Sequence, residues 1–121
     1  MALFPLFIEL SGRRALIVGG GRLALHKARM LLPYGAELTA VAPEFCPELE
    51  AMEGLTLVRR AFEPRDVEGA EIVIAATDER DVNRAVSALC RERGIPVNVV
   101  DELAECSFVF PALLRRGVLS A

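Results

Sequence analysis

Short apolar runs alternate with stretches of helical periodicity along this chain of 121 residues. The runs are rich in β-branched residues and nearly free of charge, which is typical of parallel strands buried on both faces. They predict strands at residues 14–18, 37–42, 55–59, 71–76, 96–100 and 107–110, and the start of another at 117–121. Between them the pattern predicts helices at 22–33, 47–53 and 79–93 and a short helical connection at 64–69. This alternation indicates an α/β fold with a Rossmann-like, doubly wound, mostly parallel sheet.

The ends of this pattern carry two further expectations. Residues 3–11 are apolar and contain Pro5, so we expect an arm packed onto the sheet. Thr77 and Asp78 directly precede the helix at 79–93, where they are predicted to act as N-cap residues.

A glycine cluster stands at the junction between the first strand and the first helix. Gly19, Gly21 and Ala24 fill a G-x-G-x-x-A pattern directly after the apolar run. In a dinucleotide-binding turn the first glycine permits the tight turn, the second lets the backbone approach a pyrophosphate, and the small third residue packs the helix against the strand. The helix N-terminus that follows, at Arg22 and Leu23, favours phosphate. The alternative is a glycine-rich turn that binds nothing.

Ligands of such sheets bind beyond the carboxyl ends of the strands. Pro43 and Glu44 follow the second strand, and Thr77 follows the fourth. Glu44 is either a ribose ligand or an ordinary surface residue, whereas Thr77 is a cap with room to contact a cofactor. No arginine follows the second strand closely, so a 2′-phosphate lacks its usual partner and NAD is favoured over NADP.

Asp101 directly follows the fifth strand and is the sharpest single candidate. If desolvated at the mouth of the sheet, its carboxylate would have a raised pKa and could accept a proton. The alternative is an N-cap for residues 102–105. His26 is more simply explained as a surface residue than as a ligand, and Cys106 as a small buried hydrophobic residue.

Composition narrows the functional classes. Hydrophobic residues make up 53% of the chain, which suggests either elements buried on both faces or a hidden contact surface. The net charge of −3 argues against general nucleic-acid binding. No apolar run approaches the roughly 20 residues that span a bilayer. Three cysteines without C-x-x-C spacing, and a single histidine, form no recognisable metal set and suggest free thiols in the cytoplasm.

Several motifs together resemble the N-terminal domain of the siroheme synthase family, also known as precorrin-2 dehydrogenases. The resemblance covers nearly the whole chain, and its most specific parts are Asn98-Val99-Val100-Asp101 and Ser107-Phe108-Val109-Phe110-Pro111-Ala112. It implies NAD-dependent oxidation of the tetrapyrrole precorrin-2 to sirohydrochlorin, with ferrochelatase activity in some members. It also implies that Asp101 is the key catalytic residue and that Arg22, Leu23, Pro43 and Glu44 contact NAD.

The chain also departs from the family. His26 replaces a common arginine, Leu23 a common valine, and Arg115-Arg116-Gly117 an Asp-Arg-Ser-Pro-like stretch. The family continues into a dimerisation region and a helical domain. We therefore expect residues 1–121 to be a truncated NAD-binding domain whose full-length protein is a homodimer. The competing hypothesis is a regulatory NAD-binding module without catalysis, which would not need Asp101 or the 107–112 motif.

Overall fold

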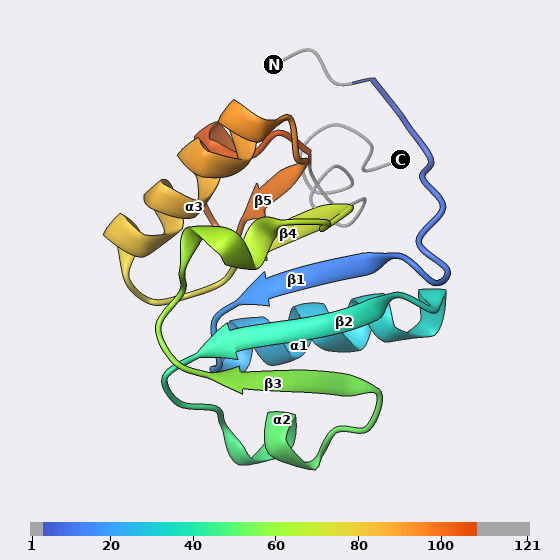
Figure 1. The fold of residues 1–121 in the computed structure, drawn as a ribbon, viewed down its shortest axis with the longest axis vertical. Helices are drawn as coiled ribbons and strands as arrows, with labels where there is room; N and C mark the ends of the chain where they lie inside the picture. The colour runs from blue at the N-terminus through green and yellow to red at the C-terminus, as the bar shows by residue number, and fades with distance from the viewer. Residues whose placement is uncertain (1–3, 109–121) are drawn as a thin grey trace, which may run out of the picture.

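The computed structural model describes residues 4–108, which form a five-stranded sheet flanked by helices (Figure 1). The strands are β1 (Arg14–Val18), β2 (Glu37–Ala42), β3 (Leu55–Arg59), β4 (Ile72–Ala75) and β5 (Val97–Val99). All pair in parallel, in the order β3-β2-β1-β4-β5. The predicted Rossmann-like parallel sheet is confirmed. The chain leaves β1 toward β3 and then returns to the other side of β1, so the switch point lies between β1 and β4.

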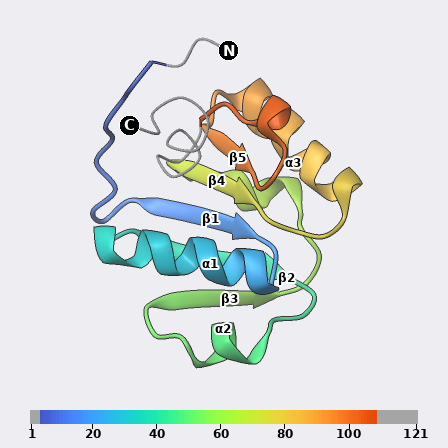
Figure 2. The ribbon, with the colours of Figure 1, turned by 180° about the vertical axis from the view of Figure 1, so that it is seen from behind.

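Helices cover both faces of this sheet. They are α1 (Arg22–Leu31), α2 (Pro47–Ala51) and α3 (Arg80–Arg93). Side chains of β1 alternate between the two faces: Ala15 and Ile17 join the core under α1, whereas Leu16 and Val18 join the core under α3. In the view from behind, α1 lies in front of the sheet (Figure 2). Burial on both faces explains why the strands read as continuous apolar runs.

Three 3₁₀ turns complete the described elements, at Leu32–Tyr34, Pro64–Val67 and Leu103–Glu105. The first ends the predicted helix 22–33 early, because Pro33 has no N–H to continue the α-helical ladder. The turn at Pro64–Val67 is the predicted short connection. The predicted strand 107–110 is wrong in its described part, where Ser107 and Phe108 form a bend. Residues 109–110 and the strand predicted at 117–121 lie outside the described residues.

The predicted packing of the N-terminal arm onto the sheet is also wrong. Phe4, Leu6 and Phe7 are between 77% and 98% exposed, and Leu10 is the first arm residue that packs against the core. The physical reason is that α1 and α3 already cover the two faces of the sheet. An apolar sequence therefore finds no free sheet surface to bury against within the described chain.

Candidate functional site

A cleft of about 670 Å³ opens at the carboxyl edge of the sheet, over β1, β2 and β4. Its volume lies within the range of about 300–1,000 Å³ that is common for ligand sites. Its walls come from segments 18–23, 41–46, 61–62 and 76–79 together with Val82. All seven residues predicted to contact the cofactor lie among them: Gly19, Gly21, Arg22, Leu23, Pro43, Glu44 and Thr77.

Gly19, Gly20 and Gly21 differ in what a side chain at each position would meet. Gly19 has a φ of 140°, and a Cβ there would overlap the carbonyl oxygen of Ala76. A Cβ on Gly20 would overlap the carbonyl oxygen of Glu44, whose loop is tied to Gly20 by the Cys46 N–H at 2.7 Å. A Cβ on Gly21 would meet nothing within 4 Å. Gly19 and Gly20 are therefore required by the fold, whereas Gly21 leaves open space in the cleft.

The N-terminus of α1 faces this space. Gly21 is the N-cap residue, no side chain caps the helix, and its first turn holds no acidic residue. The first N–H groups of the helix and its positive dipole end are thus available to an anion. Ala24 is fully buried, which lets α1 lie close to the sheet as the G-x-G-x-x-A spacing predicts.

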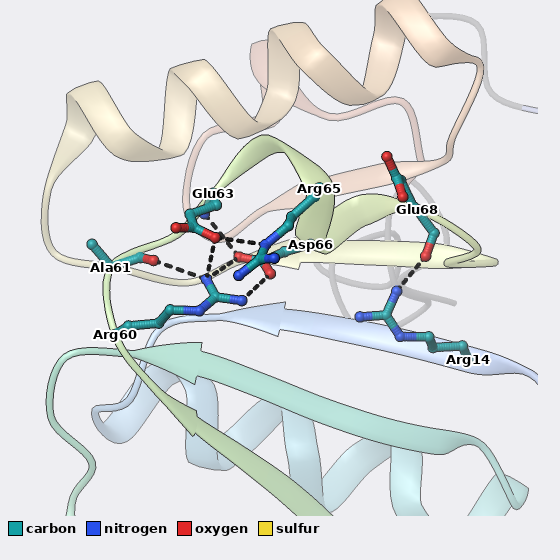
Figure 3. A network of polar contacts seen from close by, with 7 residues as sticks. All are labelled: Arg14, Arg60, Ala61, Glu63, Arg65, Asp66 and Glu68. Atoms are coloured by element: carbon teal, nitrogen blue, oxygen red, sulfur yellow. Dashed lines mark hydrogen bonds and ion pairs between the residues drawn. The ribbon is translucent and has the colours of Figure 1, made fainter.

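The wall beyond β2 and β3 is shaped by an ion-pair network (Figure 3). Arg60 donates to both carboxylate oxygens of Asp66, at 2.8 and 2.6 Å, and to the carbonyl of Ala61 at 3.2 Å. The N–H of Glu63 donates to Asp66 at 2.8 Å. These bonds hold the loop that presents Ala61 and Phe62 to the cleft. The hydrogen bonds from Arg60 lower the pKa of Asp66.

The loop after β4 is held by a buried amide. Asn83 accepts from the N–H and the hydroxyl of Thr77, at 3.2 and 2.7 Å, and donates to its carbonyl at 3.0 Å. The Thr77 hydroxyl also accepts from the N–H of Glu79, at 3.1 Å. The N-cap residue of α3 is Glu79, without a side-chain cap. The prediction that Thr77 and Asp78 are the N-cap residues is therefore wrong, because Asn83 and the Glu79 N–H engage the Thr77 hydroxyl in front of the helix.

Asp101 lies at the same edge of the sheet, on the β5 side. The register pairs Val18 with Ala75 and Ala75 with Val99, and Asp101 lies in the turn directly after β5. With strands about 4.8 Å apart, the carboxyl ends of β1 and β5 lie on the order of 10 Å from each other. Asp101 is exposed, so the desolvation considered from the sequence is absent from this structure. It does not line the cleft itself.

The backbone at Asp101 is unusual. With a φ of 64°, Asp101 is the one non-glycine residue of the described chain in the left-handed region. Aspartate tolerates that region better than most residues, and such conformations cluster at functional sites. The nearby Lys27 is half-buried: desolvation lowers the pKa of its ammonium, and the charge of Asp101 acts in the opposite direction. A positive charge thus faces the Asp101 carboxylate.

Two other residues considered from the sequence, His26 and Cys106, do not line the cleft. His26 is exposed on α1. The Cys106 thiol accepts from the Val99 N–H at 3.2 Å and donates to the Val99 carbonyl at 3.3 Å, while burial raises its pKa. Across residues 4–108 no three His, Cys, Asp or Glu side chains gather as a metal site. No helix among the same residues is long and apolar enough to cross a membrane.

Sequence reasoning missed two groups of residues. Phe45 and Phe62 line the cleft, but isolated aromatic residues after strands give no signal of a ligand. Asn83 is the other residue without a predicted role. A signal for it exists in the helical spacing, because the polar residues Asn83 and Ser87 are four residues apart and fall on the buried face of α3.

Fold and cleft together define a class: a Rossmann-type domain whose glycine turn and open helix N-terminus suit a dinucleotide. A family model described as "Putative NAD(P)-binding" matches residues 6–112. The chain belongs to this NAD(P)-binding family, and the predicted nicotinamide dinucleotide cofactor is confirmed at that level.

The chain is also similar to curated siroheme synthases in sequence and to a precorrin-2 dehydrogenase in structure. It is 46% identical over 120 residues to a siroheme synthase of Thioalkalivibrio sulfidiphilus, covering 97% of this chain and 24% of the relative. It is 47% identical over 122 residues to a siroheme synthase of Pseudomonas aeruginosa PAO1, covering 98% and 26%. The structure of SirC, precorrin-2 dehydrogenase, is similar with a TM-score of 0.75 and 27% identity, over 90% of this chain and 55% of that one. The predicted resemblance to siroheme synthases is confirmed, and the chain spans about a quarter of the length of these curated relatives.

Proposed function

We propose that this chain is the NAD-dependent dehydrogenase domain that oxidises precorrin-2 to sirohydrochlorin in siroheme biosynthesis. The observation that carries the proposal is the position of Asp101. In a chain 46% identical to siroheme synthases, the carboxylate lies at the same sheet edge as the glycine cleft, on a left-handed backbone. A domain that only bound NAD would have no use for a carboxylate held in this way.

The residues of the cleft fit a dinucleotide. The pyrophosphate belongs at Gly21 and the first N–H groups of α1, where a Cβ would meet open space and no side chain competes for the helix end. Arg22 adds a positive charge at this point. The adenosine half belongs against Pro43, Glu44 and the apolar wall of Phe45 and Phe62. Thr77, on the β4 side of the cleft, would then hold the nicotinamide half.

Charges at the adenosine end support NAD rather than NADP. Glu44 presents a carboxylate beside the cleft, which would repel a 2′-phosphate. The two arginines that follow β3 toward this wall are engaged in ion pairs: Arg59 pairs with Glu50 at 2.9 Å, and Arg60 pairs with Asp66 at 2.6 Å. Calorimetric titration with each dinucleotide is expected to give tighter binding of NAD, and tighter binding of NADP would contradict this assignment.

The reaction removes two hydrogens from the tetrapyrrole. When bound, the nicotinamide ring supplies the hydride acceptor. The proton that leaves with the hydride needs a base, and we assign that role to the Asp101 carboxylate. Lys27 places a positive charge near the Asp101 carboxylate at this edge of the sheet. The exposure of Asp101 leaves room for a large substrate at this edge of the sheet.

The test is the variant Asp101→Asn, because asparagine keeps the shape and tolerates the left-handed backbone. With precorrin-2 and NAD, the wild type is expected to form NADH, measured as a rise in absorbance. The rate of NADH formation by the variant is expected to be lower by at least about a hundredfold. NAD affinity should be unchanged. Asp81→Asn, an exposed aspartate on α3, is the matched control and should keep full turnover.

Two outcomes would overturn the proposal. Unchanged turnover in Asp101→Asn would remove Asp101 from the mechanism. NAD binding by the wild-type complete gene product without any NADH formation would favour a regulatory module instead. Ferrochelatase activity is tested separately, by adding ferrous iron to sirohydrochlorin and scoring siroheme colour above the uncatalysed rate.

We also propose that the protein is a cytoplasmic homodimer. All three cysteines are free thiols, as in a reducing compartment. The exposed Phe4, Leu6 and Phe7 form apolar surface of the kind that subunit association buries. Light scattering after size-exclusion chromatography of the complete gene product should give twice the monomer mass, and a monomer at all concentrations would refute the dimer.

A further inference from the structure

A stripe of polar side chains runs along one face of α3. Asn83, Ser87 and Arg91 are spaced by four residues, which places them one above the other on the helix. Asn83 is 7% exposed and Ser87 is fully buried. A buried polar group costs free energy unless it is hydrogen-bonded, so the partners of these side chains show what the stripe holds.

Asn83, the first residue of the stripe, bonds to the loop after β4, on the proposed cofactor side of the site. Asn83 makes three hydrogen bonds to Thr77 and thereby satisfies its N–H, its carbonyl and its hydroxyl. Thr77 lines the cleft, and the carbonyl of the preceding Ala76 is the group that leaves no room for a side chain at Gly19. The buried amide of Asn83 therefore ties the loop after β4 to α3, in addition to the bond between the Glu79 N–H and the Thr77 hydroxyl.

Ser87 and Arg91, the other two residues of the stripe, bond to the segment that follows Asp101. The Ser87 hydroxyl donates to the carbonyl of Glu105 at 2.7 Å. The Arg91 guanidinium donates to the carbonyls of Ala104 and Cys106, at 3.0 and 3.4 Å. These carbonyls belong to the segment directly after Asp101. A left-handed backbone at a non-glycine residue persists only where the surrounding structure holds it. The bonds from Ser87 and Arg91 contribute to that restraint, together with the bond from the Glu102 N–H to the Val99 carbonyl at 3.1 Å.

We propose that the α3 stripe of Asn83, Ser87 and Arg91 is the positioning device that sets the cofactor loop and the Asp101 loop relative to each other. The two loops leave the paired strands β4 and β5, and the same helix bonds to both of them, so α3 adds a second restraint on their spacing beyond the sheet. None of the three touches the reacting atoms, so all are positioning residues. The assignment of an effect on turnover rests on the proposed dehydrogenase function.

The test uses Asn83→Ala, Ser87→Ala and Arg91→Ala, with Val86→Ala as the matched control. Val86 is fully buried on the same helix and packs in the apolar core, so its truncation lowers stability without loosening either loop. Asn83→Ala is expected to raise the Kd for NAD roughly tenfold, whereas Ser87→Ala and Arg91→Ala should lower kcat roughly tenfold with the Kd for NAD unchanged. Arg91 is exposed, so its variant should fold normally, and Arg91→Lys should restore part of kcat.

A second readout separates this proposal from the proposed function. Amide hydrogen exchange needs no substrate. Asn83→Ala should speed exchange at Thr77 and Glu79, and Ser87→Ala should speed exchange in residues 102–107. If the wild type does not oxidise precorrin-2, this segregated exchange still supports the stripe while the dehydrogenase proposal fails. If exchange rises equally in both loops for every variant, Val86→Ala included, the positioning role is refuted whatever the activity.

Discussion

The three consecutive glycines allow the fold and the cofactor site to be separated by single alanine substitutions. Gly19→Ala places a residue at a φ of 140°, which costs an alanine about 1–3 kcal/mol. The new methyl group would also overlap the Ala76 carbonyl, which adds about 1–3 kcal/mol of overpacking. The expected loss of stability is therefore roughly 2–6 kcal/mol, or on the order of 8–24 °C in Tm for a chain of this size.

Gly21→Ala is expected to behave in the opposite way. The backbone at Gly21, with φ −101° and ψ −156°, is extended and suits alanine, and a Cβ there would meet nothing within 4 Å. The loss of stability should stay below about 1 kcal/mol, the cost of a poorer N-cap residue. The methyl group would occupy the space where a pyrophosphate approaches the backbone, so the Kd for NAD should rise at least about tenfold, or 1.4 kcal/mol.

Thermal unfolding followed by circular dichroism measures the first effect, and calorimetric titration with NAD measures the second. Gly20→Ala serves as an internal comparison, because its methyl group would overlap the Glu44 carbonyl and should also destabilise the fold. The reasoning is refuted if Gly19→Ala melts with the wild type. It is equally refuted if Gly21→Ala binds NAD with unchanged affinity.

Two further predictions concern titratable groups. Asp66→Asn should lower the free energy of unfolding by about 1–3 kcal/mol at pH 7, because it breaks the paired hydrogen bonds from Arg60. Those bonds lower the pKa of Asp66 in the folded state, so its contribution is present above the unfolded value of about 3.9 and is lost as pH falls through the folded value. Urea unfolding should thus show a difference in the free energy of unfolding between wild type and Asp66→Asn that is smaller at pH 3 than at pH 7, and an equal difference at both pH values would contradict the prediction. The control Glu50→Gln breaks an exposed ion pair and should lower the free energy of unfolding by less than about 1 kcal/mol. Burial raises the pKa of the Cys90 thiol to about 11, so at pH 8 a thiol reagent followed by mass spectrometry should modify the half-buried Cys46 and spare Cys90 until the chain unfolds. Equal modification of the two native thiols would show that Cys90 is accessible.

Much of the fold could be predicted from local patterns. The bounds of β1, β2 and β3 agree with the predicted runs. In β1 the reason is burial on both faces, which requires apolar residues at nearly every position. The glycine turn was predicted for the same kind of reason, since only glycine adopts the backbone that Gly19 requires. The cleft residues from Gly19 to Thr77 then followed from the rule that parallel strands end at one edge.

Other features could not be predicted, because they depend on partners distant in the sequence. The sequence predicts Thr77 as a helix cap, whereas in the structure its hydroxyl donates to Asn83, six residues later. The apolar arm resembled a packed segment, but the faces of the sheet were already covered by α1 and α3. The left-handed backbone of Asp101 has no signature in the local sequence, and the carbonyls that follow it accept hydrogen bonds from Ser87 and Arg91 of α3.

The sequence by itself determined the order of the elements, the parallel sheet and the glycine turn, because periodicity, β-branching and the absence of a side chain act within a few residues. Only the tertiary structure decided which glycines the fold requires and which one leaves open space in the cleft, since that depends on the Ala76 and Glu44 carbonyls. It also decided how Asp101 is held at the edge of the site. Close approach of distant backbone groups is a property of packing, and no local pattern encodes it.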